Sequence, residues 1–117
     1  MKDTKEIVRD YFYRLLNEKD LSVCNEILAP GYIDHDAPEN TPPDPESTRK
    51  YVANLLNDYP DLKIQIEDIL SENNKVAVRL TWHGTHKDSG DILHHWGIVI
   101  LHLSERGQIV ERWSTYE

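Results

Sequence analysis

The sequence predicts an α+β fold in which three N-terminal helices cover one face of an antiparallel sheet. Apolar residues recur at helical spacing only before residue 60, and the rest of the chain alternates apolar and polar residues with the period of a strand. The clearest alternation runs from Lys75 to Leu103, where two long strands flank the turn sequence Asp88-Ser89-Gly90. Helices early in the chain and strands late are typical of this fold class.

Two of the expected helices have clear boundaries. Asp3 has the character of an N-cap, and the apolar residues after it recur at helical spacing, which predicts an amphipathic helix over residues 4–19. Asp44 and Pro45 supply an N-cap and a first-turn proline for another helix, which stops at Pro60. These signals place one long helix at each end of the helical half of the chain.

Shorter patterns define the remaining elements. A further helix is expected from Leu21 to Ala29, where Pro30-Gly31 ends it. A short strand follows at Tyr32–Asp36, before a proline-rich loop. The later strands form an antiparallel meander of four, made of Leu62–Leu70, the two strands of the hairpin, and Gln108–Tyr116.

The register of the hairpin decides which side chains share a face. A three-residue loop places His83 opposite His95 and turns Arg79 and Thr81 toward the pocket side, whereas a one-residue slip pairs His83 with Trp96. In the three-residue register one face carries seven apolar residues, Val76, Val78, Leu80, Trp82, Trp96, Ile98 and Ile100, and Trp113 joins them. We expect a homodimer through this outer face, centred on the three tryptophans Trp82, Trp96 and Trp113. The alternative is that the tryptophans close one end of a curled sheet.

Composition restricts the partners and the location of the protein. With 117 residues the chain is expected to form a single domain, residues 1–117. A formal charge of -8 without any Lys/Arg run argues against nucleic acid and anionic membranes as partners. The single cysteine, Cys24, cannot form an internal disulfide, and the charged start lacks the apolar core of a signal peptide. We therefore expect a cytoplasmic protein.

Four segments resemble a known family: NEKDLSVCNEILAPGYIDHDAP, YPDLKIQIEDIL, NKVAVRLTWHGTH and RGQIVERW. They are similar to the SnoaL-like polyketide cyclase group, within the superfamily named after nuclear transport factor 2, and the resemblance runs from about residue 4 to residue 116. It implies a cone-shaped, cystatin-like α+β barrel with a strongly curved sheet, an apolar pocket inside the cone, and dimerisation on the outer sheet face. The fold hosts many unrelated activities, so the reaction has to be argued from the site.

Comparison with the family's functional positions gives a mixed result. Where SnoaL-type cyclases carry an aspartate on the last strand, this chain has Ser114, which cannot serve as their acid or base. Where ketosteroid-isomerase-like members carry a tyrosine on the first helix, this chain has Phe12. Their catalytic base, an aspartate after the first strand, is matched by Asp36. The resemblance therefore implies that only some of the family's catalytic residues are present.

The candidate catalytic residues are Asp36 and His83. A carboxylate in an apolar cone or a histidine beside a carboxylate can abstract a proton next to a carbonyl. The alternatives are that His83 only hydrogen-bonds a neighbouring strand and that Asp34 to Asp36 cap the proline-rich loop. Eight further residues are candidate ligand contacts: Phe12, Tyr32, Asp34, His35, Arg79, His95, Ser114 and Tyr116. Arg79 could instead form an ion pair with Glu67, Asp68 or Glu111.

No metal and no cofactor is expected. A site made of His83, His95 and Asp36 requires the three-residue register, and the chain has neither a cluster of thiolates nor a glycine-rich phosphate loop. Two functions remain open. One is a cofactor-free, acid–base cyclase or isomerase acting on a small apolar carbonyl compound. The other is a non-catalytic ligand-binding or dimeric scaffold protein of the same fold.

Overall fold

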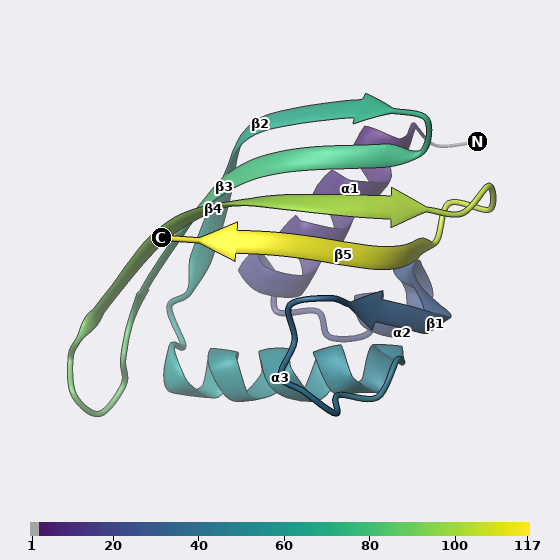
Figure 1. Cartoon of the computed structure of the whole chain (residues 1–117). Coiled ribbons are helices and arrows are strands. Elements are labelled where there is room, and N and C mark those ends of the chain that lie inside the picture. The colour runs from purple at the N-terminus through teal and green to yellow at the C-terminus, as the bar shows by residue number, and fades with distance from the viewer. Residues whose placement is uncertain (1–2) are drawn as a thin grey trace.

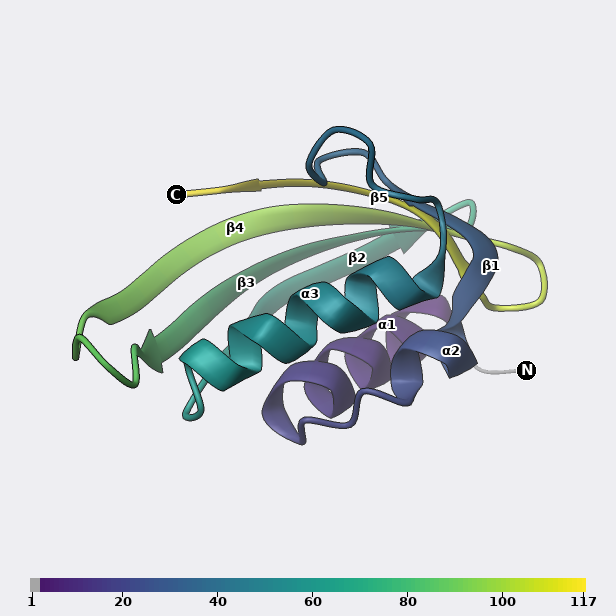
Figure 2. The same cartoon turned by 90° about the horizontal axis from the view of Figure 1, so that it is seen from below.

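The computed structural model describes residues 3–117 and contains a five-stranded sheet with helices on one side of it. The elements follow in the order α1 (Thr4–Phe12), the π-helix η1 (Tyr13–Asn17), α2 (Val23–Ile27), β1 (Leu28–Asp34), α3 (Pro45–Asp58), β2 (Lys63–Glu72), β3 (Lys75–Thr85), β4 (Ile92–Leu103) and β5 (Ile109–Tyr116). The strand order is β1-β5-β4-β3-β2, with β1 parallel to β5 and the other neighbours antiparallel. Figures 1 and 2 show a bent sheet whose concave side faces α1 and α3, so its convex side is left without helices. In the described residues no helix is long and apolar enough to cross a bilayer.

The helix starts expected from the sequence are confirmed. The Asp3 carboxylate accepts a hydrogen bond from the backbone N–H of Lys5 at 3.3 Å. Asp44 accepts one from the N–H of Ser47 at 2.8 Å, and Pro45 occupies the first turn of α3. The expected single helix over residues 4–19 is instead α1 followed by a wider π-helical turn.

The π-helical turn attaches the helical layer to the edge of the sheet. The Asn17 side-chain amide donates to the carbonyl of Ile64 at 2.9 Å and its oxygen accepts from the N–H of Ile64 at 2.7 Å. The hydroxyl of Tyr13 accepts from the N–H of Ile66 at 3.0 Å. Backbone groups that β2 would otherwise expose at this edge are therefore paired by side chains.

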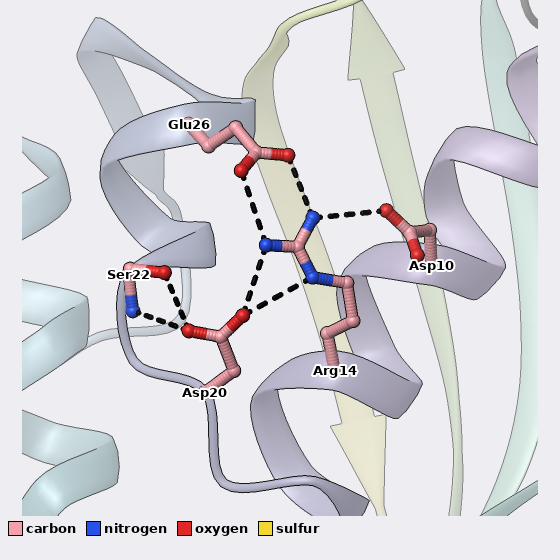
Figure 3. Close-up of polar contacts among 5 residues, drawn as sticks. All are labelled: Asp10, Arg14, Asp20, Ser22 and Glu26. Atoms are coloured by element: carbon pink, nitrogen blue, oxygen red, sulfur yellow. Dashed lines mark hydrogen bonds and ion pairs between the residues drawn. The ribbon is translucent and has the colours of Figure 1, made fainter.

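A cluster of charges around Arg14 fixes the turn between η1 and α2 (Figure 3). Its guanidinium lies 2.6 Å from Glu26, 2.9 Å from Asp20 and 3.2 Å from Asp10. Asp20 in turn accepts from the backbone N–H of Ser22 at 3.1 Å and binds its hydroxyl. One arginine thus joins carboxylates from α1, the turn and α2, and orients α2 for the strand that follows.

The first strand begins earlier than the sequence predicted. Leu28 and Ala29, expected in a helix, and Pro30-Gly31, expected to end it, all lie inside β1. β1 is an edge strand paired only with β5, and its register is irregular between Leu28 and Ile33. A proline there removes no necessary sheet hydrogen bond, which explains why it is compatible with the strand.

The predicted register of the central hairpin is wrong by one residue. His83 lies opposite His94, not His95. The N–H of His86 donates to the carbonyl of Asp91 at 2.8 Å, so the loop between these residues has one residue more than expected. Gly90 has the expected positive φ of 76°. The ring Nδ1 of His86 accepts the backbone N–H groups of residues 88 and 89, a side-chain cap that spacing alone does not reveal.

This register reverses the predicted relation between the two strands of the hairpin. Side chains alternate between the two faces of a sheet. A slip of one residue therefore moves every side chain of one strand to the opposite face relative to the strand it pairs with. The inner face carries Val76, Val78, Leu80 and Trp82 of β3, and the first three are fully buried. The outer face carries the exposed residues Trp96, Ile98 and Ile100 of β4, which we call the outer apolar patch. Trp82 is therefore not part of the outer face as predicted.

Candidate functional site

A cavity of about 670 Å³ lies between the helices and the concave side of the sheet. Its size is in the range of small-molecule sites in proteins. Five parts of the chain form it: α1 with η1, the end of β1 with the loop after it, α3, β3 and β5. The lining residues are Tyr11, Phe12, Leu15, Leu16, Tyr32, Ile33, Asp34, Asp36, Ala37, Pro38, Thr41, Pro42, Pro43, Asp44, Ser47, Thr48, Tyr51, Val52, Leu55, Trp82, Arg112, Ser114, Thr115 and Tyr116.

The sheet side of the cavity carries its main polar groups. Arg112, Ser114 and Tyr116 alternate along β5 and all reach the inner face. The guanidinium of Arg112 donates a hydrogen bond to the Tyr116 hydroxyl. The Tyr116 ring passes over Gly97 and meets the Trp82 ring edge to face, with centroids 5.6 Å apart. An aromatic wall therefore holds the arginine beside the cavity.

The helical side contributes tyrosine hydroxyls and an aromatic face. The Phe12 ring centroid lies 5.9 Å from Cζ of Arg112, a cation–π distance. Tyr11 and Tyr32 are both buried beside it. Burial raises the pKa of both hydroxyls, and the nearby Arg112 offsets only part of that rise. Both hydroxyls therefore remain protonated at neutral pH and can donate hydrogen bonds.

Two carboxylates stand at the rim: Asp34 is the last residue of β1, and Asp36 lies in the loop that follows. Asp36 Oδ2 accepts from the backbone N–H of Ser114 at 2.6 Å, and the N–H of Asp36 donates to Oδ1 of Asp34 at 3.0 Å. These contacts tie the loop after β1 to β5, which agrees with the capping role considered for this segment. Both carboxylates also line the cavity. The rim thus presents carboxylates in the same cavity as the arginine and tyrosines, next to β5.

Of the ten residues predicted for the site, six line the cavity: Phe12, Tyr32, Asp34, Asp36, Ser114 and Tyr116. Arg79 and His83 do not, because the true register turns both onto the outer face. Arg79 forms an ion pair with Asp68 at 2.7 Å, which was the alternative considered for it. The His83 ring stacks on His94, with centroids 4.2 Å apart. No pair of His83 with Asp36 is formed.

The other two predicted residues also lie outside the cavity. His35 stacks on the outer-face residue Trp113 at 4.7 Å, and its Nε2 lies 2.9 Å from the Glu111 carboxylate. His95 lies opposite Trp82 on the inner side of the hairpin but is exposed and does not line the cavity. His83 and His95 face opposite sides of the sheet, so they cannot share an ion. Within residues 3–117 no group of three or more His, Cys, Asp or Glu side chains could hold a metal.

Sequence reasoning missed several polar residues of the cavity, of which Tyr11, Trp82 and Arg112 matter most for its chemistry. Arg112 could have been found from the two-residue period of β5, because Ser114 and Tyr116 were already placed inside. Trp82 required the hairpin register. Tyr11 carries no local signal, since its spacing in α1 is that of an ordinary core residue.

Comparisons with known proteins support the fold and place the chain in a family. Three solved structures share the fold with almost the whole chain. A candidate polyketide cyclase from Bacillus cereus is 24% identical, with TM-score 0.84, over 97% of this chain and 74% of that one. IdmH, a candidate polyketide cyclase from Streptomyces antibioticus, is 23% identical, with TM-score 0.85, over 99% and 93% of the two chains. TsrD from Streptomyces laurentii is 19% identical, with TM-score 0.87, over 100% and 92%.

At such identities these structures show the fold alone, and no curated protein matches the chain significantly. The family assignment comes instead from the sequence as a whole. The family model described as SnoaL-like polyketide cyclase matches residues 6–117, which is nearly the full length of the sequence. That range includes every strand, every wall of the cavity and both rim carboxylates. The chain belongs to the SnoaL-like polyketide cyclase family.

Proposed function

We propose that the cavity binds a small apolar carbonyl compound and that the protein acts on it as a cofactor-free cyclase or isomerase. The observation that carries this proposal is that Asp34 and Asp36 line the same cavity as Arg112 and the tyrosine hydroxyls. A base and a set of hydrogen-bond donors facing one enclosed space are what proton abstraction beside a carbonyl requires.

Asp36 is the proposed base. One of its carboxylate oxygens accepts from the N–H of Ser114, and that bond orients the other oxygen. The base takes a proton from the carbon next to the carbonyl, and the electron pair moves to the carbonyl oxygen. The Arg112 guanidinium and the Tyr32 hydroxyl stabilise the resulting enolate oxygen. The carbanion attacks a second carbonyl of the same molecule in a cyclisation, or takes the proton back elsewhere in an isomerisation, and Asp36 returns the proton.

A second candidate is ligand binding without turnover. It is favoured by the exposure of Asp36 and by its structural bond to Ser114, together with the position of His83 outside the cavity. In this case the carboxylate would hold the loop after β1 in place, and the cavity would bind its ligand unchanged.

Hydrogen exchange of a ketone separates the two candidates. With α-tetralone in heavy water, we expect the wild type to accelerate loss of the proton signal beside the carbonyl, measured by NMR. Asp36→Asn should lower that rate by about 100-fold, because general-base catalysis contributes about that much. Asp88→Asn, in the hairpin loop outside the cavity, is the matched control and should exchange as the wild type does. Tetralone binding with no wild-type acceleration would leave only the binding function.

We also propose that the protein is a homodimer through the outer apolar patch. Trp96, Ile98 and Ile100 are 48%, 42% and 40% exposed and follow one another along the uncovered side of β4. Trp113 of β5 lies opposite Ile100 on the same face and extends the patch. A contiguous apolar strip on a sheet face without helices favours burial against a second copy.

Substitution at the centre of the patch tests the dimer. Ile98→Asp should convert a dimer into a monomer, because two buried carboxylates would face each other across the two-fold interface. Multi-angle light scattering after size-exclusion chromatography measures the mass directly. Ile92→Asp, at the start of β4 beside the hairpin loop and 72% exposed, is the control and should leave the mass unchanged. A wild-type mass equal to one chain would refute the proposed dimer.

A further inference from the structure

The cavity wall contains polar atoms that are buried and have no hydrogen-bond partner. Among the described side chains these atoms are the Tyr11 hydroxyl, Nε1 of Trp82 and Nε of Arg112. Buried polar atoms in folded proteins nearly always have a partner, since leaving one unpaired is unfavourable. All three residues line the same cavity, although they come from α1, β3 and β5. Three unpaired donors around one cavity indicate a binding site for a hydrogen-bond acceptor.

The charge of this cluster is positive, and among the described residues no ion pair neutralises it: Asp34 of the neighbouring strand acts on Arg112 electrostatically without an ion-pair contact. A guanidinium remains protonated at any physiological pH. The contacts of Arg112 are with neutral groups: it donates to the Tyr116 hydroxyl, hydrogen-bonds Tyr32 and lies 5.9 Å from the Phe12 ring. Within residues 3–117 no carboxylate forms an ion pair with it, whereas Arg14, Arg49 and Arg79 each have one. A partly buried cation whose direct contacts are all neutral favours an anionic partner.

The tyrosines add further hydrogen-bond donors to this cluster and bring no negative charge. Burial raises the pKa of Tyr11, Tyr32 and Tyr116, so their hydroxyls keep their protons at neutral pH. The protein as a whole carries a formal charge of -8, which repels anions from its surface in general. Attraction for an anion must therefore come from this cluster, where a charged and several neutral donors converge.

We propose that the ligand of the cavity is an organic acid with an apolar body, and that its carboxylate binds to Arg112 together with Tyr11 and Trp82. The proposal rests on the proposed function and gives its substrate a class. The carboxylate accepts from the guanidinium and from the Tyr11 hydroxyl and Trp82 indole N–H, all of which are donors. The apolar body lies against Phe12, Leu16 and Val52, which line the same cavity. The carbon beside the reacting carbonyl then points to the rim carboxylates, and the carbonyl oxygen faces the Tyr32 hydroxyl and the N–H groups of Arg112 that the ligand carboxylate leaves free.

Matched pairs of probes test the charge preference. Naphthoate and its methyl ester, and cinnamate and its methyl ester, differ mainly in one negative charge. We expect each acid to bind the wild type at least about tenfold more tightly than its ester, because charge-assisted hydrogen bonds are about twice as strong as neutral ones. Calorimetry gives the affinities, and the indole N–H signal of Trp82 in a nitrogen-correlated NMR spectrum should shift with the acids. That signal is assigned with Trp82→Phe.

Two variants and a control show which residues produce the preference for the acid. Arg112→Gln should remove the preference for the acid, while Arg79→Gln, which removes the same charge from the outer face, should retain it. Tyr11→Phe should weaken acid binding with little effect on the ester and should not lower the melting temperature, because its hydroxyl has no partner in the fold. If Arg112→Gln fails to melt cooperatively, Tyr11→Phe decides the question, and unchanged acid affinity in that variant overturns the proposal.

The outcomes separate this inference from the proposed function. Equal affinity for acid and ester in the wild type, or an acid preference that persists in Arg112→Gln, overturns the anionic ligand and leaves the carbonyl-binding function intact. Binding of neither member of either pair, together with no exchange of α-tetralone, overturns both.

Discussion

Gly97→Ala is expected to destabilise the protein by about 2–3 kcal/mol, as overpacking of a well-packed interior does. A Cβ at this position would lie 2.5 Å from the carbonyl oxygen of Thr115 and would also collide with the Tyr116 ring. Alanine has a slightly better strand propensity than glycine, worth about 0.5–1 kcal/mol in the opposite direction. The collision dominates because the Thr115 oxygen belongs to the paired backbone of β5 and cannot move alone.

The same substitution should also disturb the cavity. Tyr116 carries the hydroxyl that accepts from Arg112, so displacing its ring moves the partner of the arginine. Urea unfolding measures the loss of stability, and naphthoate calorimetry measures the effect on the cavity. Gly31→Ala is the matched control, because a Cβ there meets no atom within 4 Å. A Gly97→Ala protein with wild-type stability would mean that Tyr116 does not cover this glycine in solution.

Leu80→Ala is expected to lower the free energy of unfolding by about 2–5 kcal/mol, the range for removing a buried leucine side chain. Leu80 is 0% exposed and lies at the centre of β3, on the face that meets the helices. Its neighbours in the sheet include Gly97, which has no side chain to fill the space. The total stability of a domain this size is about 5–15 kcal/mol, so this one change removes a large share of it.

The control for Leu80→Ala uses the same substitution at an exposed site. Leu70, in the neighbouring strand β2, is 71% exposed. Leu70→Ala should change the free energy of unfolding by less than about 0.5 kcal/mol, as for an ordinary surface position. Chemical denaturation followed by tryptophan fluorescence measures both. Equal effects of the two substitutions would contradict the assignment of the inner and outer faces of the sheet.

Much of the fold could be predicted because its signals are local. The N-caps Asp3 and Asp44, and the two-residue alternation after Leu62, each depend on a few neighbouring residues. The start of β1 was missed because Pro30 ordinarily ends an element, and only its place at the edge of the sheet makes a proline acceptable there. The resemblance to the SnoaL-like family, stated from four segments, is confirmed over residues 6–117.

The candidate site was less predictable because it depends on which side chains of β3 and β4 face the inside of the sheet. One additional residue in the loop before Gly90 turns Arg79 and His83 outward and brings Trp82 inward. What fixes that loop is the His86 side chain, which accepts backbone N–H groups within the turn. A pattern of residue types does not contain this information. Arg112 was accessible in principle, because its alternation with Ser114 places both on the same side of β5.

The position of β5 has a consequence for the order in which the protein folds. β5 lies between β4 and β1, and Leu28 pairs with Ile109, although roughly 80 residues separate these partners along the chain. The hairpins β2–β3, β3–β4 and β4–β5 need only short loops to close, whereas β1 has no neighbour in the sheet until it docks on the distant β5. Tyr32 and Asp34 belong to β1 and Asp36 follows it, so the four-stranded meander can form before the cavity has this wall. We therefore expect competence to bind to depend on this long-range pairing rather than on the local hairpins.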